Sequence, residues 1–175
     1  GAPQCDPAIF SLGIPILGIC YGLQITAKTL GGLVKPGKAR EYGHADITVT
    51  RRQPLFSKLP AGLRVWMSHG DQVKRMPRGF KAMARTATCP VAAMGDAKRN
   101  IFGLQFHPEV VHTPRGTEIL RHFLFNICKC RGDWKLAQFV KESINAIRQE
   151  VGKAHVVCGL SGGVDSAVSA ALLQK

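Results

Sequence analysis

Residues 14–24 read IPILGICYGLQ, and they give the clearest indication of the fold. The apolar run 14–19 has the character of a buried strand, and residues 21–30, YGLQITAKTL, have the apolar spacing of a helix. Between them stands Cys20 in the pattern G-x-C-x-G. This pattern is the thiol counterpart of the nucleophile elbow, a strained strand-to-helix turn that exposes a nucleophile.

The elbow predicts a reactive thiol with a particular local geometry. Gly18 and Gly22 are expected where any Cβ would collide with neighbouring backbone. The sulfur of Cys20 would lie at a helix N-terminus, where the helix dipole favours thiolate. The backbone N–H of Tyr21 would then face a developing oxyanion. From this pentapeptide alone, a structural cysteine in a glycine-rich turn remains an equal alternative.

Residues 103–110, GLQFHPEV, supply partners for such a thiol. In an extended segment, residues two apart project on the same side, so His107 and Glu109 are expected to touch or cooperate. A histidine can take the proton of Cys20, and a carboxylate can orient the imidazole. In an isolated H-P-E sequence, the histidine and glutamate most often have no joint role. When the sequence accompanies a nucleophile elbow, the elbow argues against that interpretation.

Composition narrows the class of protein. The 175 residues are 45% hydrophobic, and no apolar run reaches the length of a membrane span. The six cysteines are scattered without a C-x-x-C pair, and no secretory signal is seen, so we expect reduced thiols, a cytoplasmic location and no metal site. The formal charge of +13 is dispersed and has few interleaved aromatics, which argues against nucleic acid as a partner.

The remaining pattern alternates strands and helices. We expect short strands at 45–50, 64–69 and 80–86, a hairpin from 91–94 and 101–106, and a helix from Thr113 to Cys130. Residues 131–133 are the expected boundary, followed by a helix over 136–151, a strand at 155–160 and a new helix after 161–166.

That last turn reads SGGVDS, residues 161–166. Glycines let backbone N–H groups close on a phosphate, serines add hydroxyl donors, and a helix N-terminus favours negative charge. No G-K-[ST] follows, so the turn is not a Walker A loop. By itself, a glycine-rich turn between a strand and a helix is weak evidence.

The elbow and the GLQFHPEV segment together resemble the class I glutamine amidotransferases, whose signatures are PxLGICxGxQ and GxQFHPE. The resemblance covers roughly residues 1–130 and implies glutamine as substrate. It makes Cys20 the nucleophile, His107 the acid/base and Glu109 its orienting residue. It further implies that Gln24, and with less support Asp71, bind glutamine. A second oxyanion donor of that family, on a GGP-type loop, has no match here.

The SGGVDS turn resembles the pyrophosphate loop of the N-type ATP pyrophosphatases. The resemblance implies ATP binding, with Mg²⁺, by Ser161, Gly162, Gly163, Val164, Asp165, Ser166 and Ala167. The two motifs in one chain resemble the glutamine-dependent synthetases that aminate XMP to GMP.

The implied fold is α/β: a flavodoxin-like amidotransferase domain without its N-terminal part (residues 1–132), then the first α-β-α piece of an adenine-nucleotide α-hydrolase-like domain (133–175). We expect a fragment whose GGP loop lies upstream and whose XMP-binding and homodimerisation regions lie beyond Lys175.

Two alternatives stay open. One is a stand-alone triad glutaminase, a γ-glutamyl hydrolase or an amidotransferase subunit of another biosynthetic enzyme, with SGGVDS a coincidental turn. The other is a basic, non-catalytic nucleic-acid-binding protein, for which aromatic-rich basic patches are missing. The SGGVDS turn argues against the first.

Overall fold

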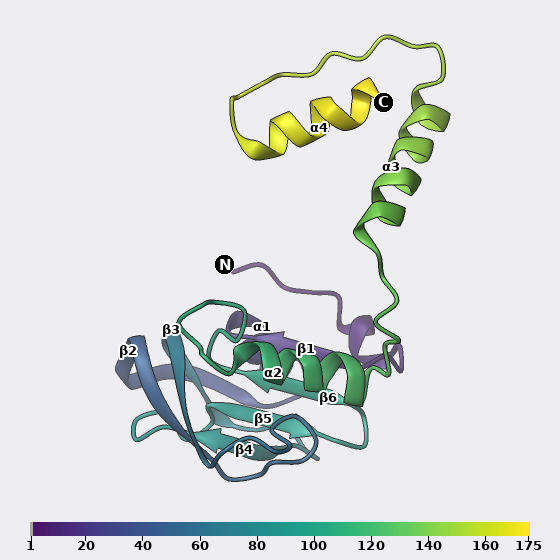
Figure 1. The fold of residues 1–175 in the computed structure, drawn as a ribbon. Helices are drawn as coiled ribbons and strands as arrows, with labels where there is room; N and C mark the ends of the chain where they lie inside the picture. Colours follow the sequence, from purple (N-terminus) through teal and green to yellow (C-terminus); the bar gives the residue numbers. More distant parts are fainter. Residues whose placement is uncertain (1) are drawn as a thin grey trace. The chain divides into compact units, whose positions relative to one another are not determined.

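The computed structural model describes residues 2–175, and the chain divides into two compact units, Gly1–Cys130 and Arg131–Lys175 (Figure 1). The first opens with a short 3₁₀ helix, Pro7–Ser11, whose Asp6 side chain accepts a hydrogen bond from the N–H of Ala8 at 2.9 Å. Each unit is described by itself below.

Within the described residues of the first unit, six strands form one mixed sheet in the order β1-β6-β5-β4-β2-β3. The strands β1 and β6 pair in parallel and the other neighbours pair antiparallel. The α/β class expected from the sequence is confirmed. The bounds are β1 Ile16–Ile19, β2 Leu33–Val49, β3 Gly62–Arg75, β4 Lys81–Arg85, β5 Ala93–Asp96 and β6 Ile101–Leu104.

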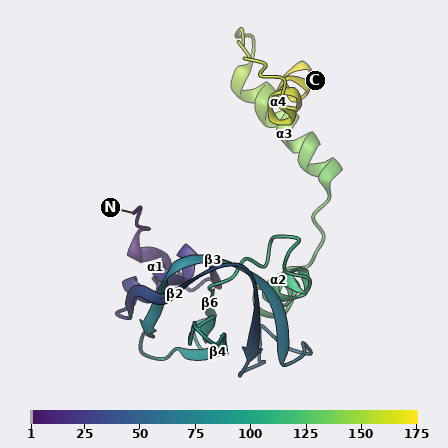
Figure 2. The same ribbon diagram turned by 90° about the vertical axis from the view of Figure 1, so that its left-hand side faces the viewer.

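Helices cover both faces of this sheet. On one face, α1 (Tyr21–Thr29) buries Leu23 in a cluster with Ile101. On the other face, α2 (Gly116–Arg121) and the π-helical turn η2 (His122–Ile127) join a cluster that contains Phe102. Ile101 and Phe102 fall in different clusters because successive side chains of a strand point to opposite faces. Figure 2 shows α1 and α2 on opposite sides of β6.

Two expectations about this unit need correction. The strands expected at 45–50 and 64–69 are parts of a much longer antiparallel hairpin, β2 with β3. The proline and glycine at 36–37 cause an irregularity in the pairing but do not end the strand. The helix expected from Thr113 begins at Gly116 and turns π-helical at His122. Its buried side includes Ile119 and Ile127, whereas Leu124 is 44% exposed.

The second unit has two helices among its described residues, α3 (Leu136–Val151) and α4 (Val164–Gln174). The helix expected over 136–151 is confirmed, and the next one begins inside the SGGVDS turn. The expected strand at 155–160 is wrong: these described residues are irregular, because no neighbouring strand in this unit offers them hydrogen bonds. Val157 is 98% exposed, so the unit leaves apolar side chains uncovered.

Candidate active site

Cys20 occupies a strained turn between β1 and α1. It has φ +50°, which is unfavourable for a side-chain-bearing residue, and it precedes α1 as its N-cap. Gly18 permits this close approach, since an added Cβ there would lie 2.6 Å from the carbonyl carbon of Gly22. The same expectation fails for Gly22, where an added Cβ would meet nothing within 4 Å because that side of α1 faces open space.

Parallel pairing of β1 with β6 carries the two sequence motifs to one edge of the sheet. The N–H of Cys20 donates to the carbonyl of Leu104 at 2.7 Å. The next residue, Gln105, is fully buried, and its Nε2 donates to Cys20 Sγ at 3.8 Å. Sequence reasoning gave Gln105 no role, although it lies two residues before His107 and alternation in an extended segment places both on one side.

His107 and Glu109 are in contact, as their spacing predicts. His107 Nδ1 and Glu109 Oε1 are 2.7 Å apart. The backbone of His107 is also fixed, because its N–H donates to the carbonyl of Trp66 at 3.0 Å and its carbonyl accepts from Thr113 Oγ1 at 2.6 Å. Thr113, expected as the first residue of a helix, lies before the helix and anchors the histidine through its hydroxyl.

The start of α2 closes over this segment. An added Cβ at Gly116 would overlap the carbonyl of Pro108, so only glycine lets the helix approach so closely. The same Thr113 hydroxyl accepts from the N–H of Trp66 at 3.0 Å, which ties the segment to β3. The 107–109 segment is therefore hydrogen-bonded to β3 and packs against the start of α2.

Three groups contact the sulfur of Cys20: the Ser68 carbonyl, the Gln105 side chain and the N–H of Tyr21. It donates to the carbonyl of Ser68 at 3.6 Å and accepts from Gln105, while no described hydrogen bond joins it to His107. Burial raises the pKa of the Cys20 thiol above its ordinary value and outweighs the opposing hydrogen bond from the Tyr21 N–H. The expected thiolate-favouring effect of the helix N-terminus is therefore outweighed by burial at this position.

A cavity of about 610 Å³ opens beside Cys20, a volume typical of small-molecule sites. Four residues singled out from the sequence line it: Cys20, Tyr21, Gln24 and Asp71. Gln24 Nε2 donates to the carbonyl of Asp71 at 3.0 Å and lies 3.4 Å from Gln105 Oε1. His107 and Glu109 are not among the described residues that line it. Sequence reasoning missed other lining residues of the long β2–β3 hairpin, which include Arg40, Tyr42 and His69.

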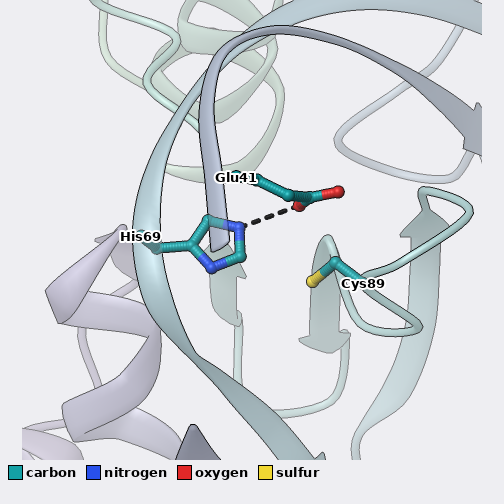
Figure 3. A group of neighbouring side chains, drawn as sticks. All are labelled: Glu41, His69 and Cys89. Atoms are coloured by element: carbon teal, nitrogen blue, oxygen red, sulfur yellow. Dashed lines mark hydrogen bonds and ion pairs between the residues drawn. The ribbon is translucent and has the colours of Figure 1, made fainter. Parts of the chain in front are cut away.

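Three residues near this cavity have side chains that could hold a metal ion: Glu41, His69 and Cys89, whose ligand atoms lie within 4.8 Å of one another (Figure 3). Both ring nitrogens of His69 are already hydrogen-bonded, to Glu41 at 2.9 Å and to the Asp71 carbonyl at 3.0 Å. Burial, with the charge of Glu41, raises the pKa of the Cys89 thiol to about 12. The group is therefore a hydrogen-bonded set with a neutral thiol beside it.

In the second unit, the SGGVDS turn leads into α4. Gly162 has φ +82°, a conformation that favours glycine, and Gly163 is the N-cap of the helix. The hydroxyls of Ser161 and Ser166 lie 3.1 Å apart, and Ser166 Oγ donates to the carbonyl of Gly163 at 2.9 Å. The two hydroxyls thus lie together at the start of α4, and a helix N-terminus favours a phosphate.

The class of protein follows from comparison with known families. The family model described as "Glutamine amidotransferase class-I" matches residues 1–127, and the model described as "NAD synthase" matches residues 135–175. The chain belongs to the class I glutamine amidotransferase family. The second match covers the part of the chain that carries SGGVDS.

Individual relatives narrow the likeness further. The chain is 53% identical over 175 residues to the glutamine-hydrolysing GMP synthase of Ruminiclostridium cellulolyticum, all of this chain and 34% of the relative. The chain therefore spans about a third of the length of the curated relatives that it matches.

Two solved structures resemble the fold. A Thermoplasma acidophilum protein, provisionally described as one subunit of a GMP synthase, has a TM-score of 0.67 at 38% identity, over 69% of this chain and 60% of that one. A glutamine amidotransferase of Thermotoga maritima has a TM-score of 0.55 at 26% identity, over 95% of this chain and 56% of that one. None of the described helices has the length and apolar character needed to cross a membrane.

Proposed function

We propose that this chain is the glutaminase part, with the first piece of the ATP-dependent part, of a glutamine-hydrolysing GMP synthase. The observation that carries the proposal is the pairing of β1 with β6, which brings the Cys20 elbow and the Gln105–Glu109 segment to one edge of the sheet beside a cavity. The likeness to GMP synthases along the whole chain supports the choice of product.

In this proposal, Cys20 Sγ attacks the side-chain amide carbon of glutamine. Because burial raises the pKa of the thiol, His107 must accept the thiol proton as the C–S bond forms. The carbonyl oxygen becomes an oxyanion that the N–H of Tyr21 faces. Glu109, bonded to Nδ1, orients the ring and leaves Nε2 for the reaction.

The second half of the reaction reverses these roles. His107 returns the proton to the departing nitrogen. Ammonia is then released, and a γ-glutamyl thioester remains on Cys20. The histidine then takes a proton from water, which attacks the thioester carbon. Glutamate leaves, and the thiol recovers its proton. The C–N bond is replaced by a C–O bond, with water as the only co-reactant.

We assign glutamine recognition to Gln24 and Asp71. Both line the cavity that contains Cys20, and the Gln24 side chain is held by the Asp71 backbone. The Asp71 carboxylate offers a negative charge for the α-ammonium group of glutamine.

The ATP-dependent step belongs to the second unit in this proposal. Residues 161–167, from Ser161 to Ala167, would hold ATP phosphates at the start of α4, where the loop geometry fits an anion. ATP, accompanied by Mg²⁺, would adenylate an oxygen of XMP and release pyrophosphate, and ammonia would then displace AMP from the adenylated carbon to give GMP.

We further propose the domain division 1–132 and 133–175, a homodimer formed outside this chain, and a cytoplasmic enzyme without nucleic-acid or membrane partners. The boundary agrees within two residues with the separation of the compact units at Cys130.

The test compares nitrogen sources in the full-length enzyme. Cys20→Ala is expected to abolish GMP formation from glutamine and to leave formation from ammonium intact, because ammonia bypasses the glutaminase. Asp165→Ala is expected to lower GMP formation from either source by roughly one to two decades, the cost of a charge-assisted contact of about 1.5–3 kcal/mol, while basal glutamate release continues. Loop variants that make GMP normally would contradict the synthetase assignment and favour a stand-alone glutaminase.

A further inference from the structure

We infer that Glu41 and His69 form a buried positioning pair that holds the 68–71 segment of β3 against the Cys20 elbow. The pair would thereby fix the wall of the cavity that receives glutamine. This inference rests on the proposed glutaminase function and adds to it two positioning residues, which act through the 68–71 segment and make no described contact with Cys20, His107 or Glu109.

His69 connects Glu41 to the 68–71 segment through hydrogen bonds at both ring nitrogens. It is 4% exposed, and its two ring nitrogens face two different oxygens. The Asp71 carbonyl can only accept, so Nδ1–H donates to it. The other nitrogen, Nε2, is 2.9 Å from Glu41 Oε2, which fixes the ring in one orientation (Figure 3).

Glu41 is anchored independently of the cavity. Its Oε1 accepts from Thr86 Oγ1 at 2.6 Å and also from Thr88 Oγ1, and both threonines lie in the turn that follows β4. Only about 10% of the Glu41 side chain is exposed. The carboxylate therefore links the β4 end to His69, and a carboxylate with this many donors does not move without losing several hydrogen bonds.

The segment that His69 holds contacts the nucleophile elbow on both sides of the histidine. The Ser68 carbonyl accepts from the thiol of Cys20 at 3.6 Å. The Asp71 carbonyl accepts from Gln24 Nε2 at 3.0 Å as well as from His69. A shift of this segment would displace the thiol partner and Gln24 together, although neither is bonded to Glu41.

A metal site made by Glu41, His69 and Cys89 is the competing interpretation of the same cluster. It would require the Cys89 sulfur as a ligand, whereas the positioning pair needs only the carboxylate and the imidazole. Cys89→Ala therefore separates the two roles, because the described side-chain hydrogen bonds of Glu41 and His69 do not involve Cys89.

The test measures kcat and KM for glutamine, by glutamate release, in the full-length enzyme with ATP and XMP present. Glu41→Ala and His69→Leu are expected to lower kcat/KM about ten- to a hundredfold, mainly through KM, because a displaced wall misplaces the substrate. Glu41→Gln is expected to stay within about threefold of wild type. In this variant the neutral ring with its proton on Nδ1 can accept at Nε2 from the amide nitrogen, and the amide oxygen can still accept from the threonines. Cys89→Ala is expected to match wild type.

Controls separate positioning from loss of folding. GMP formation from ammonium and the midpoint of thermal unfolding both report whether a variant is folded. If the pair only stabilised the fold, a variant would have a lower unfolding midpoint but an unchanged KM for glutamine at temperatures below that midpoint. If Glu41→Ala or His69→Leu does not fold, Thr88→Val removes one donor to Glu41 and is expected to raise KM about threefold.

The inference is overturned if KM for glutamine is unchanged in the folded variants, or if Cys89→Ala raises KM as much as His69→Leu, which would favour a metal. Absence of glutamate release by the wild-type enzyme would instead overturn the proposed function.

Discussion

Gln105 Nε2 lies 3.8 Å from Cys20 Sγ, although 85 positions separate the two residues along the chain. The contact exists because β1 and β6 run in parallel side by side, so the residues that follow each strand meet at the same edge of the sheet. Gln105 Oε1 also accepts from Gln24 Nε2 at 3.4 Å, so Gln105 contacts both the elbow and the helix that follows it.

Glu109→Gln should weaken glutamine hydrolysis without affecting the use of ammonium. A neutral amide cannot stabilise the imidazolium that forms on His107, so we expect kcat for glutamate release to fall by roughly two to four decades. Steady-state glutamate release by the full-length enzyme measures this effect. Glu118→Gln is the matched control, because Glu118 is another exposed carboxylate of the same unit but pairs with Arg115. Equal loss in both variants would show that Glu109 has no special role.

Gly18→Ala and Gly22→Ala should differ sharply in stability. At Gly18 the added methyl meets backbone, which cannot yield easily, so we expect a loss of about 1–3 kcal/mol in the free energy of unfolding, or more. At Gly22 it meets open space within α1, and alanine is a better helix former by about 1 kcal/mol. Denaturant unfolding measures the free energy of unfolding of both variants. Equal stabilities, or a Gly22→Ala variant less stable than Gly18→Ala, would contradict the close approach of backbone at Gly18.

Alkylation of Cys20 by a small neutral reagent should accelerate with pH over a range above that of a free thiol. The reactive form is the thiolate, and a raised pKa shifts its formation to higher pH. At neutral pH Cys130 and Cys158 should react faster than Cys20 because they are exposed to the reagent, and Cys89, which is buried and has a pKa of about 12, should react last. Iodoacetamide labelling at several pH values, read by peptide mapping, gives the order. A Cys20 midpoint below that of free cysteine would contradict it.

Sequence patterns predicted the parts of this fold that local chemistry determines. The elbow and the contact of His107 with Glu109 each depend on residues within a few positions of one another. The long β2–β3 hairpin could not be predicted, because its pairing bridges an irregularity near Pro36 that looks like a strand end. Residues 155–160 show the opposite failure: a strand-like sequence stays irregular where this unit gives it no partner.

The site shows the same division between local and distant contacts. Cys20, Gln24 and Asp71 line one cavity. Gln105 and His69 were not assigned roles because their importance depends on residues far away in the sequence. Burial of the thiol is likewise a tertiary property, and it reverses the pKa direction that the helix start alone predicts.

Labelling with a glutamine-like electrophile is the sharpest test of the claim that Cys20 is the glutaminase nucleophile. The full-length enzyme is incubated with a glutamine analogue that carries a chloroketone in place of the side-chain amide, and the modified peptide is mapped. We predict one label per chain on Cys20, prevented by excess glutamine, with loss of glutamine-dependent GMP formation and retention of ammonium-dependent formation. Equal labelling of Cys89 or Cys158, or labelling of Cys20 that glutamine does not prevent, would contradict the claim.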